Sequence, residues 1–109
     1  MQVQTYRARS GQCPFDDWYD GLDDNAISRV TMALARLANG QFGNVKPVGS
    51  GVLEFRIDFG PGYRIYFGRD GQDLILLLTG GDKRRQTRDI NAAITYWADY
   101  RRRKRQSEG

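Results

Sequence analysis

Residues 46–83 read KPVGSGVLEFRIDFGPGYRIYFGRDGQDLILLLTGGDK, and the spacing of apolar residues in this stretch decides the fold. Residues 52–59 alternate apolar with polar side chains, which predicts a β-strand with one buried face. After the turn-forming residues 60–62, residues 63–68 alternate in the same way. Residues 74–79 are apolar on both faces, as in a central strand that is covered on both sides. Three consecutive strands joined by short turns predict an antiparallel meander.

The flanking sequence predicts one further strand and three helices. Residues 2–9 alternate and predict a first strand. Pro14 suits the start of a helix, and apolar residues recur at helical spacing over residues 15–22 and again over residues 27–37. A last helix is indicated by the apolar spacing over residues 90–97.

This order, β-α-α-β-β-β-α, predicts an α+β domain with an antiparallel sheet of about four strands and helices packed on one face. The other face of the sheet would stay open and would carry Arg56, Arg64 and Tyr66. Residues 1–100 are expected to form a single domain. Residues 101–109 are expected to form a basic tail that is frayed or disordered.

The net charge of +4 is unevenly distributed along the 109 residues. Five of the 17 basic residues, but only one of the 13 acidic residues, lie after position 100. The first 100 residues therefore carry equal numbers of both charges. A terminal block such as Arg101-Arg102-Arg103-Lys104-Arg105 is typical of an electrostatic arm for nucleic acid, or else of a solvated helix end.

The chain has no histidine and one cysteine, Cys13. These counts exclude the usual Ser-His and Cys-His nucleophiles and argue against a zinc site. We therefore expect no metal and no cofactor, and any chemistry must come from lysine, arginine, tyrosine and carboxylates. The lone cysteine and the absence of a long apolar run predict a cytoplasmic protein without a membrane segment.

Four pieces of sequence, taken in order, carry a resemblance to a known family. They are Lys46-Pro47-Val48-Gly49, residues 53–58 (LEFRID), residues 62–67 (GYRIYF) and Gly80-Gly81-Asp82-Lys83. Over residues 3–98 the chain resembles the RelE/ParE toxin superfamily, and most closely its HigB-like addiction module killer proteins. The resemblance implies a RelE-like fold and the toxin role in a type II toxin–antitoxin system.

The resemblance also implies the partners. The first is a cognate antitoxin, expected to be a small helix-turn-helix protein. RelE-like members are ribosome-dependent mRNA endonucleases that inhibit translation without a metal, so the ribosome and mRNA would be the targets. ParE-like members instead poison DNA gyrase, and a member without catalytic activity would retain only antitoxin binding. The same scaffold supports mRNA cleavage, gyrase poisoning and antitoxin binding without catalysis, so the fold alone does not identify the function.

In the RelE-like reaction, a ribose 2′-hydroxyl attacks the adjacent phosphate, and negative charge builds up on phosphorus. Arg64 matches the arginine of the family's Gly-Tyr-Arg segment and suits the stabilisation of that charge. Its alternative role is an ion pair with Glu54 or Asp58. Catalytic roles are also implied for Arg56, which matches a basic position on the preceding strand, and for Lys83 and Arg84, which match a basic pair lining the site.

Further contacts to nucleic acid are expected from residues around this group. Lys46, in a loop bounded by glycine and proline, could touch phosphate or serve the structure or the antitoxin interface. Tyr66 could stack on a base or pack against a neighbouring strand. The remaining candidates are the arginines Arg85, Arg88, Arg101, Arg102 and Arg103.

The last helix departs from the RelE-like pattern. RelE-like nucleases often place a tyrosine or histidine there, whereas residues 87–90 read TRDI. Asp89 could replace the missing group as a proton acceptor or could cap the helix. This departure favours the gyrase alternative.

Overall fold

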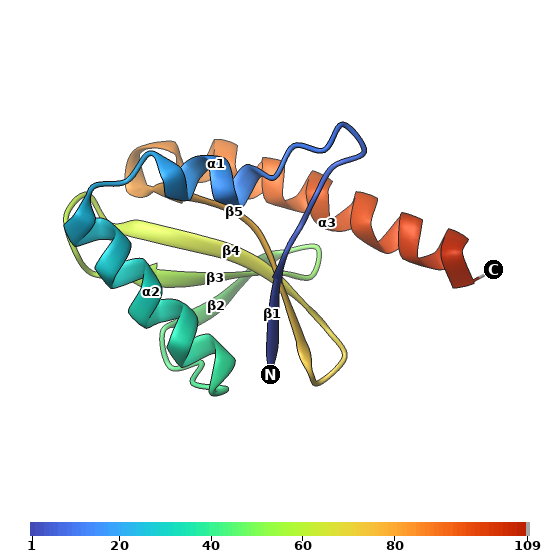
Figure 1. Ribbon diagram of the computed structural model, residues 1–109, viewed down its shortest axis with the longest axis horizontal. Helices are drawn as coiled ribbons and strands as arrows, with labels where there is room; N and C mark the ends of the chain where they lie inside the picture. The colour runs from blue at the N-terminus through green and yellow to red at the C-terminus, as the bar shows by residue number, and fades with distance from the viewer. Residues whose placement is uncertain (109) are drawn as a thin grey trace.

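The computed structural model describes residues 1–108 as five strands, three α-helices and one 3₁₀ turn (Figure 1). Their bounds, in chain order, are β1 Gln2–Thr5, α1 Pro14–Asp20, α2 Asp24–Ala38, β2 Val45–Gly49, β3 Val52–Ile57, β4 Tyr63–Asp70, β5 Leu74–Asp82, the 3₁₀ turn η1 Lys83–Arg85, and α3 Gln86–Glu108. The α+β class and the order of the predicted elements are confirmed, with β2 as an additional strand.

The sheet has the strand order β1-β5-β4-β3-β2. The strands β2 to β5 form the antiparallel series, whereas β1 runs parallel to β5, with Gln2 opposite Leu74. The expectation of about four antiparallel strands is therefore wrong in two respects: the sheet has five strands, and one pairing is parallel. The predicted first strand also ends earlier than expected, at Thr5.

The strand β2 occupies the stretch that was expected to be a loop around Lys46. Lys46 lies opposite Glu54 of β3, and Pro47 lies opposite Leu53. Proline is tolerated in this strand because β2 is at the edge of the sheet, where one side of the backbone needs no partner. The position of Lys46 beside Glu54 is thereby fixed by backbone pairing.

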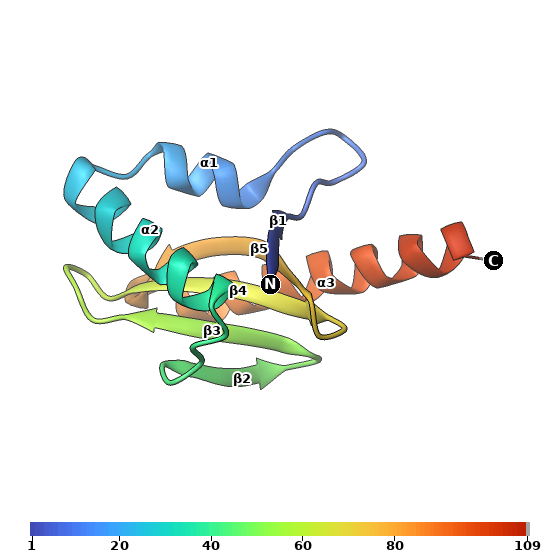
Figure 2. The ribbon, with the colours of Figure 1, turned by 60° about the horizontal axis from the view of Figure 1, so that its bottom comes forward.

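The helices α1 and α2 pack on one face of the sheet, as Figure 2 shows. Phe15 of α1 and Val30 and Leu37 of α2 join Phe55 and Phe67 of the sheet in one buried core. The helix α2 begins where the Asp23 carboxylate accepts a hydrogen bond of 2.8 Å from the Ala26 backbone N–H.

The helix α3 covers the opposite face, where Ala93 and Trp97 pack with Tyr66, Leu76 and Leu78 in a second core. The expectation that this face stays open is therefore wrong. The helix α3 can approach β4 closely because Gly68 has no side chain. A Cβ on Gly68 would lie 2.4 Å from the Trp97 ring. The helix then continues past the sheet to Glu108 (Figure 1). The expectation of a frayed or disordered tail is therefore wrong for residues 101–108, and Gly109 lies outside the described residues.

None of the helices within residues 1–108 has the length and apolarity that a membrane crossing requires.

Candidate nucleic-acid interface

A cluster of polar residues is buried between the sheet and the start of α3. It comprises Glu54 of β3, Arg64 and Tyr66 of β4, Thr79 of β5 and Asp89 of α3. Strand register explains their proximity: Glu54 lies opposite Tyr66, which lies opposite Thr79, and Arg64 lies opposite Gly81 in the next row. Side chains at alternate positions share a face, so the predicted strands bring these groups together. We call this group the buried polar cluster.

Arg64 lies at the centre of the buried polar cluster, as its sequence position suggested. Its side chain is only 8% exposed, and its Nε lies 3.8 Å from Glu54 Oε2. One terminal nitrogen donates a hydrogen bond of 2.9 Å to the Gly62 carbonyl. Nε itself has no hydrogen-bond partner among the described residues. The guanidinium is therefore held in position but keeps donors that an anion could accept from.

Glu54 is completely buried and is approached from three elements. Lys46 Nζ of β2 lies 3.8 Å from Oε1, Arg64 of β4 lies beside Oε2, and Gln86 Nε2 of α3 donates to Oε2 at 2.9 Å. Oε1 has no hydrogen-bond partner among the described residues. A carboxylate with a free oxygen beside an arginine has the composition of a proton acceptor next to an anion site.

Tyr66 has no exposed surface, because α3 packs over it. The prediction that its ring stacks on a base is therefore wrong for this conformation, and the alternative of packing within the sheet is confirmed. Burial, reinforced by the nearby carboxylates of Glu54 and Asp89, raises the pKa of the Tyr66 hydroxyl above its ordinary value. Tyr66 therefore stays protonated, and its buried hydroxyl has no hydrogen-bond partner among the described residues.

Asp89 lies directly over Gly81, where a Cβ would fall inside the Asp89 carboxylate. Burial raises the pKa of Asp89, while the nearby Arg88 charge opposes the increase. Asp82 is the N-cap of η1, the turn that leads into α3, and its carboxylate accepts a hydrogen bond of 2.9 Å from the Arg84 backbone N–H. Asp89 is thus a buried member of the cluster in the first turn of α3, and the capping role expected for it belongs to Asp82.

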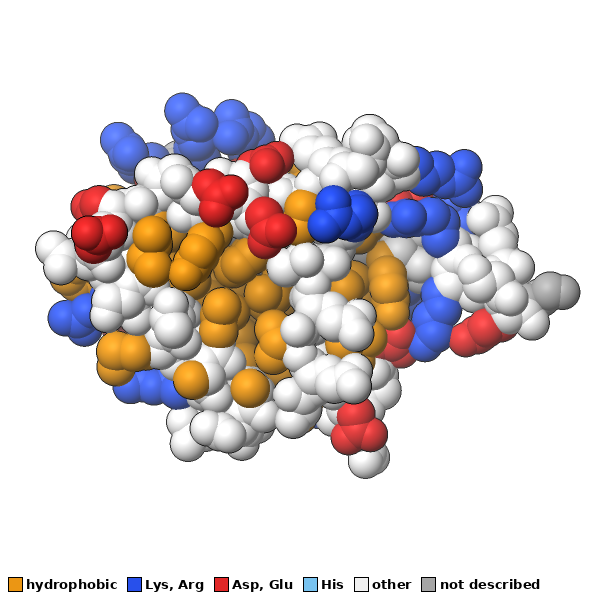
Figure 3. Space-filling model, in the orientation of Figure 1, with side chains coloured by type: hydrophobic (Ala, Val, Ile, Leu, Met, Phe, Trp, Pro, Cys, Tyr) orange, Lys and Arg blue, Asp and Glu red, His pale blue; other side chains and the backbone are white. Residues whose placement is uncertain are grey.

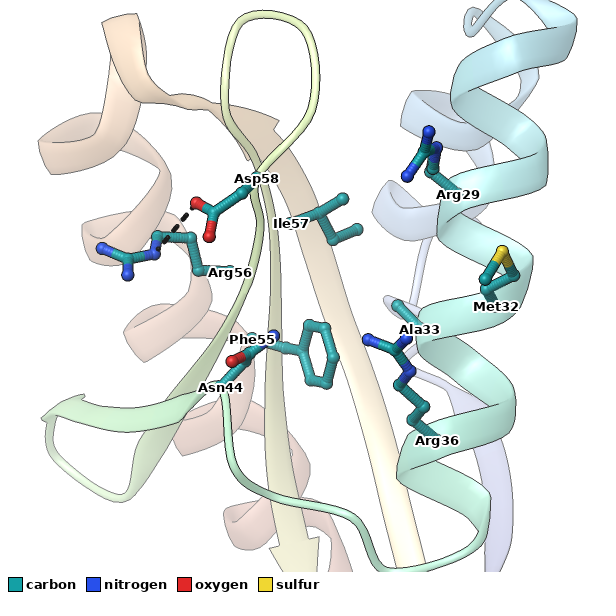
Figure 4. Close-up of a pocket in the computed structure, with 9 residues that line it drawn as sticks. All are labelled: Arg29, Met32, Ala33, Arg36, Asn44, Phe55, Arg56, Ile57 and Asp58. Atoms are coloured by element: carbon teal, nitrogen blue, oxygen red, sulfur yellow. Dashed lines mark ion pairs between the residues drawn. The ribbon is translucent and has the colours of Figure 1, made fainter.

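Exposed cations surround the buried polar cluster. Arg56 lies opposite Arg64 in the sheet and pairs with Asp58 at 3.4 Å. Figure 4 shows Arg56 and Asp58 pointing away from α2, whereas Phe55 and Ile57 point toward it. Arg56 therefore projects on the same side of the sheet as Arg64. The other exposed cations of this region are Lys46, Lys83, Arg84, Arg85 and Arg88.

Arg84 and Lys83 each have a local contact that affects their proposed roles. Arg84 pairs with Asp82 at 3.1 Å, and this contact holds the pKa of the Asp82 carboxyl below its usual value. Lys83 follows β5 directly, and its Cβ lies 3.6 Å from where a Cβ on Gly62 would stand. The Lys83 stem is thus adjacent to the turn that holds Arg64.

The basic residues near the end of α3 divide into two groups. Arg103 donates a hydrogen bond of 2.7 Å to the Arg7 carbonyl, pairs with Asp99 at 2.9 Å and lies over the Tyr6 ring. Lys104 contacts Asp70 at 2.6 Å. These two side chains hold α3 against the body. Arg103 thus has a structural contact, and its contact with nucleic acid stays a prediction. Arg101, Arg102 and Arg105 are exposed, and Lys104 is still 43% exposed beside Asp70.

A family model described as "Phage derived protein Gp49-like (DUF891)" matches residues 17–97. The chain belongs to the Gp49-like family. This is a toxin-like family related to toxins of the RelE/HigB type. The chain is also 41% identical over 80 residues to an uncharacterized protein of Haemophilus influenzae, covering 72% of this chain and 81% of that protein.

The matched part of the Gp49-like chain contains every member of the buried polar cluster and ends at Trp97, before the basic end of α3. Sequence reasoning placed Arg64 on the correct face of the sheet but expected that face to be open, and it treated Glu54 only as a possible partner for Arg64. The signal for Glu54 was present, because alternation puts Glu54 on the polar face with Arg56. Its complete burial depends on α3, and no local pattern reveals that contact.

Proposed function

We propose that this Gp49-like protein is the toxin of a type II toxin–antitoxin pair and cleaves mRNA on the ribosome in the cytoplasm. The observation that carries the proposal is the buried Arg64–Glu54 pair surrounded by exposed cations. Such an arrangement combines a site for a phosphate with a group that can accept a proton. The family relation to RelE/HigB-type toxins supports the same reading.

In this proposal the chain's own residues carry out each part of the reaction. Lys83 and Arg84 hold the phosphates on either side of the scissile one, and Arg56 assists from the neighbouring strand. Arg64 donates hydrogen bonds to the phosphate oxygens as charge builds on phosphorus. Glu54 Oε1 takes the proton from the 2′-hydroxyl.

Proton return and access complete this scheme. A lysine such as Lys83 can return a proton to the leaving 5′-oxygen, so that the proton balance closes. Glu54 Oε1 is buried and has Lys46 Nζ 3.8 Å from it, so substrate entry requires the Lys46 side chain to turn aside.

Toeprinting of a translated message with purified protein tests the proposal. Wild type should create new stops on the message, and Arg64→Gln should lower the cleavage rate by about 100-fold or more, as expected for loss of one charge-stabilising donor. Arg36→Gln, on the far side of the sheet in α2, is the matched control and should cleave like wild type (Figure 4). The absence of new stops at every dose of wild type would reject the nuclease proposal.

A gyrase poison is the second candidate. It is favoured by the burial of Tyr66 and by the lack of tyrosine or histidine in the first turn of α3, residues 86–89. This candidate predicts gyrase-linked DNA breaks after expression, with messages of unchanged length. A non-catalytic member would produce neither effect and would leave growth unaltered.

The toxin proposal includes a protein antitoxin as the partner. Figure 3 shows apolar side chains gathered on the face that carries α1 and α2, with acidic side chains along its upper border. Partly buried apolar residues on this face include Trp18 and Tyr19 of α1, Leu22 between the two helices, and Leu34 of α2. An amphipathic antitoxin helix would cover them. Co-expression with the neighbouring reading frame tests this: Leu22→Asp should abolish recovery of the complex, whereas Ser28→Asp should preserve it.

A further inference from the structure

The outward side chains of α3 form one continuous stripe. Its members follow at alternating intervals of three and four residues, which places them on one side of a helix. They are Arg88, Asn91, Thr95, Ala98, Arg102 and Arg105, and all six are exposed. Arginines therefore stand at both ends of the stripe, and small uncharged residues lie between them.

No carboxylate interrupts this stripe within residues 86–107. Glu108, 66% exposed, follows Arg105 by three residues and stands just beyond the end of the stripe, where it contacts Lys104 at 4.0 Å. Beside the stripe lie Asp89 and Asp99, with carboxylates only 11% and 19% exposed. They contact Arg88 at 3.8 Å and Arg102 at 2.9 Å, while these arginines remain 70% and 57% exposed. A guanidinium has five N–H donors, so one carboxylate contact orients it and leaves donors for a further anion. Arg105 has no ion pair among the described residues.

The two ends of the stripe are well separated. Arg88 and Arg105 lie 17 positions apart in one helix, which corresponds to about 25 Å at 1.5 Å per residue. A stacked nucleic-acid strand advances about 3.4 Å per nucleotide, so the stripe spans about seven nucleotides. Asn91, Thr95 and Ala98 are short, so a backbone can approach the helix between the two arginine groups.

We propose that this stripe, the α3 track, binds the sugar–phosphate backbone of a single strand of RNA. The Arg88 end lies beside the buried polar cluster, and the Arg102–Arg105 end holds the same strand about 25 Å away. The inference deepens the proposed function, on which it rests, by assigning a path to the substrate strand. The proposal assigns RNA contacts to Arg102 and Arg105. It leaves out Arg103 and Lys104, which contact Arg7 and Asp70 of the body.

Salt-dependent binding of a 12-nucleotide 2′-O-methyl RNA, followed by fluorescence anisotropy, tests the track. Blocked 2′-oxygens prevent the proposed cleavage, so binding is measured apart from catalysis. The double variant Arg102→Gln/Arg105→Gln should reduce the magnitude of the negative slope of log K against log salt by about 1.4, at roughly 0.7 per lost phosphate contact on a single strand. The affinity advantage of wild type should therefore shrink about sevenfold between 50 and 200 mM salt. Arg88→Gln should reduce the magnitude of the slope by about 0.7.

The matched control is Arg29→Gln/Arg36→Gln, which removes two exposed arginines from α2 on the other side of the sheet. Its slope should equal that of wild type. An equal loss of slope in this control would overturn the track in favour of a net-charge effect. An unchanged slope in the Arg102/Arg105 variant, or two oligonucleotides bound per protein, would also overturn it.

Two further outcomes separate the track from the proposed function. If wild type fails to bind the oligonucleotide at 50 mM salt but still creates toeprint stops, the track is wrong and the nuclease proposal stands. If a 12-base-pair DNA duplex binds with the arginine-dependent slope and the RNA does not, the assignment to RNA is overturned. The backbone contacts would then belong to DNA.

Discussion

The interaction between Glu54 and Arg64 should be the largest single electrostatic contribution to stability on the α3 side of the sheet. Their side chains are 0% and 8% exposed, and the facing nitrogen and oxygen lie 3.8 Å apart. Two unit charges at about 4 Å attract by about 4 kcal/mol when the effective dielectric constant is about 20. Removing one member leaves the other charge buried without its partner, which costs about 3–5 kcal/mol.

A double-mutant cycle measures this interaction. Glu54→Gln and Arg64→Gln should each lower the free energy of unfolding by about 3–5 kcal/mol, and the double variant should lose about 4 kcal/mol less than the sum of the two. Urea unfolding followed by the fluorescence of Trp18 and Trp97 provides the measurement. Arg56→Gln is the control: its pair with Asp58 is exposed, so its removal should change the free energy by less than about 1 kcal/mol.

Two results would refute the reasoning. A loss below about 1 kcal/mol in Glu54→Gln would mean that the buried carboxylate gains little from its surroundings. Strict additivity in the cycle would mean that the two charges do not interact, and that Glu54 depends on Gln86 and Lys46 instead. Either result would remove the support for Arg64 as a group oriented by Glu54.

Two other predictions concern how α3 is held. Gly68→Ala should lower the free energy of unfolding by about 1–3 kcal/mol, because the added Cβ would lie 2.4 Å from the Trp97 ring; Gly43→Ala, whose Cβ would have no neighbour within 4 Å, should change it far less in the same urea assay. Burial, followed by the hydrogen bond and charge of Asp99, raises the pKa of Tyr6 to about 12, so Asp99→Asn should move the ultraviolet titration of this phenol back toward 10. The Tyr6 phenol ionises more readily in the unfolded chain than in the folded protein, so the free energy of unfolding of wild type should fall as the pH rises from 10 to about 12. An equal fall in Asp99→Asn would contradict the role of Asp99 in raising the pKa of Tyr6.

The sequence predicted β3, β4 and β5 because their patterns are local. Alternation in the first two and a continuous apolar run in the third are properties of neighbouring residues. The strand β2 escaped prediction because Pro47 and its flanking glycines are typical of a loop, and an edge strand buries too little to impose alternation. The parallel pairing of β1 with β5 joins residues about 70 positions apart, and no local signal specifies it.

The same distinction applies to the candidate site. Alternation placed Arg56 and Arg64 on one face, and the strand register agrees. The burial of Tyr66 was not predictable, because it depends on where α3 docks. The apolar side of α3 comprises Ala93 and Trp97 with Ile90, Ile94, Tyr96 and Tyr100. Its spacing predicts a helix but does not reveal which surface the helix will meet.

The composition of the buried polar cluster narrows the explanations for it. A buried ion pair generally contributes less to stability than well-packed apolar residues of similar size. Apolar residues occupy other interior positions on the same face of the sheet, such as Val52 and Leu78. Stability alone therefore gives no reason for Glu54 and Arg64 to be where they are, whereas a reaction or a ligand that needs a fixed guanidinium does. The exposed cations around the pair and the arginine stripe of α3 lie on the same side of the sheet, which makes an anion the ligand that this face fits best.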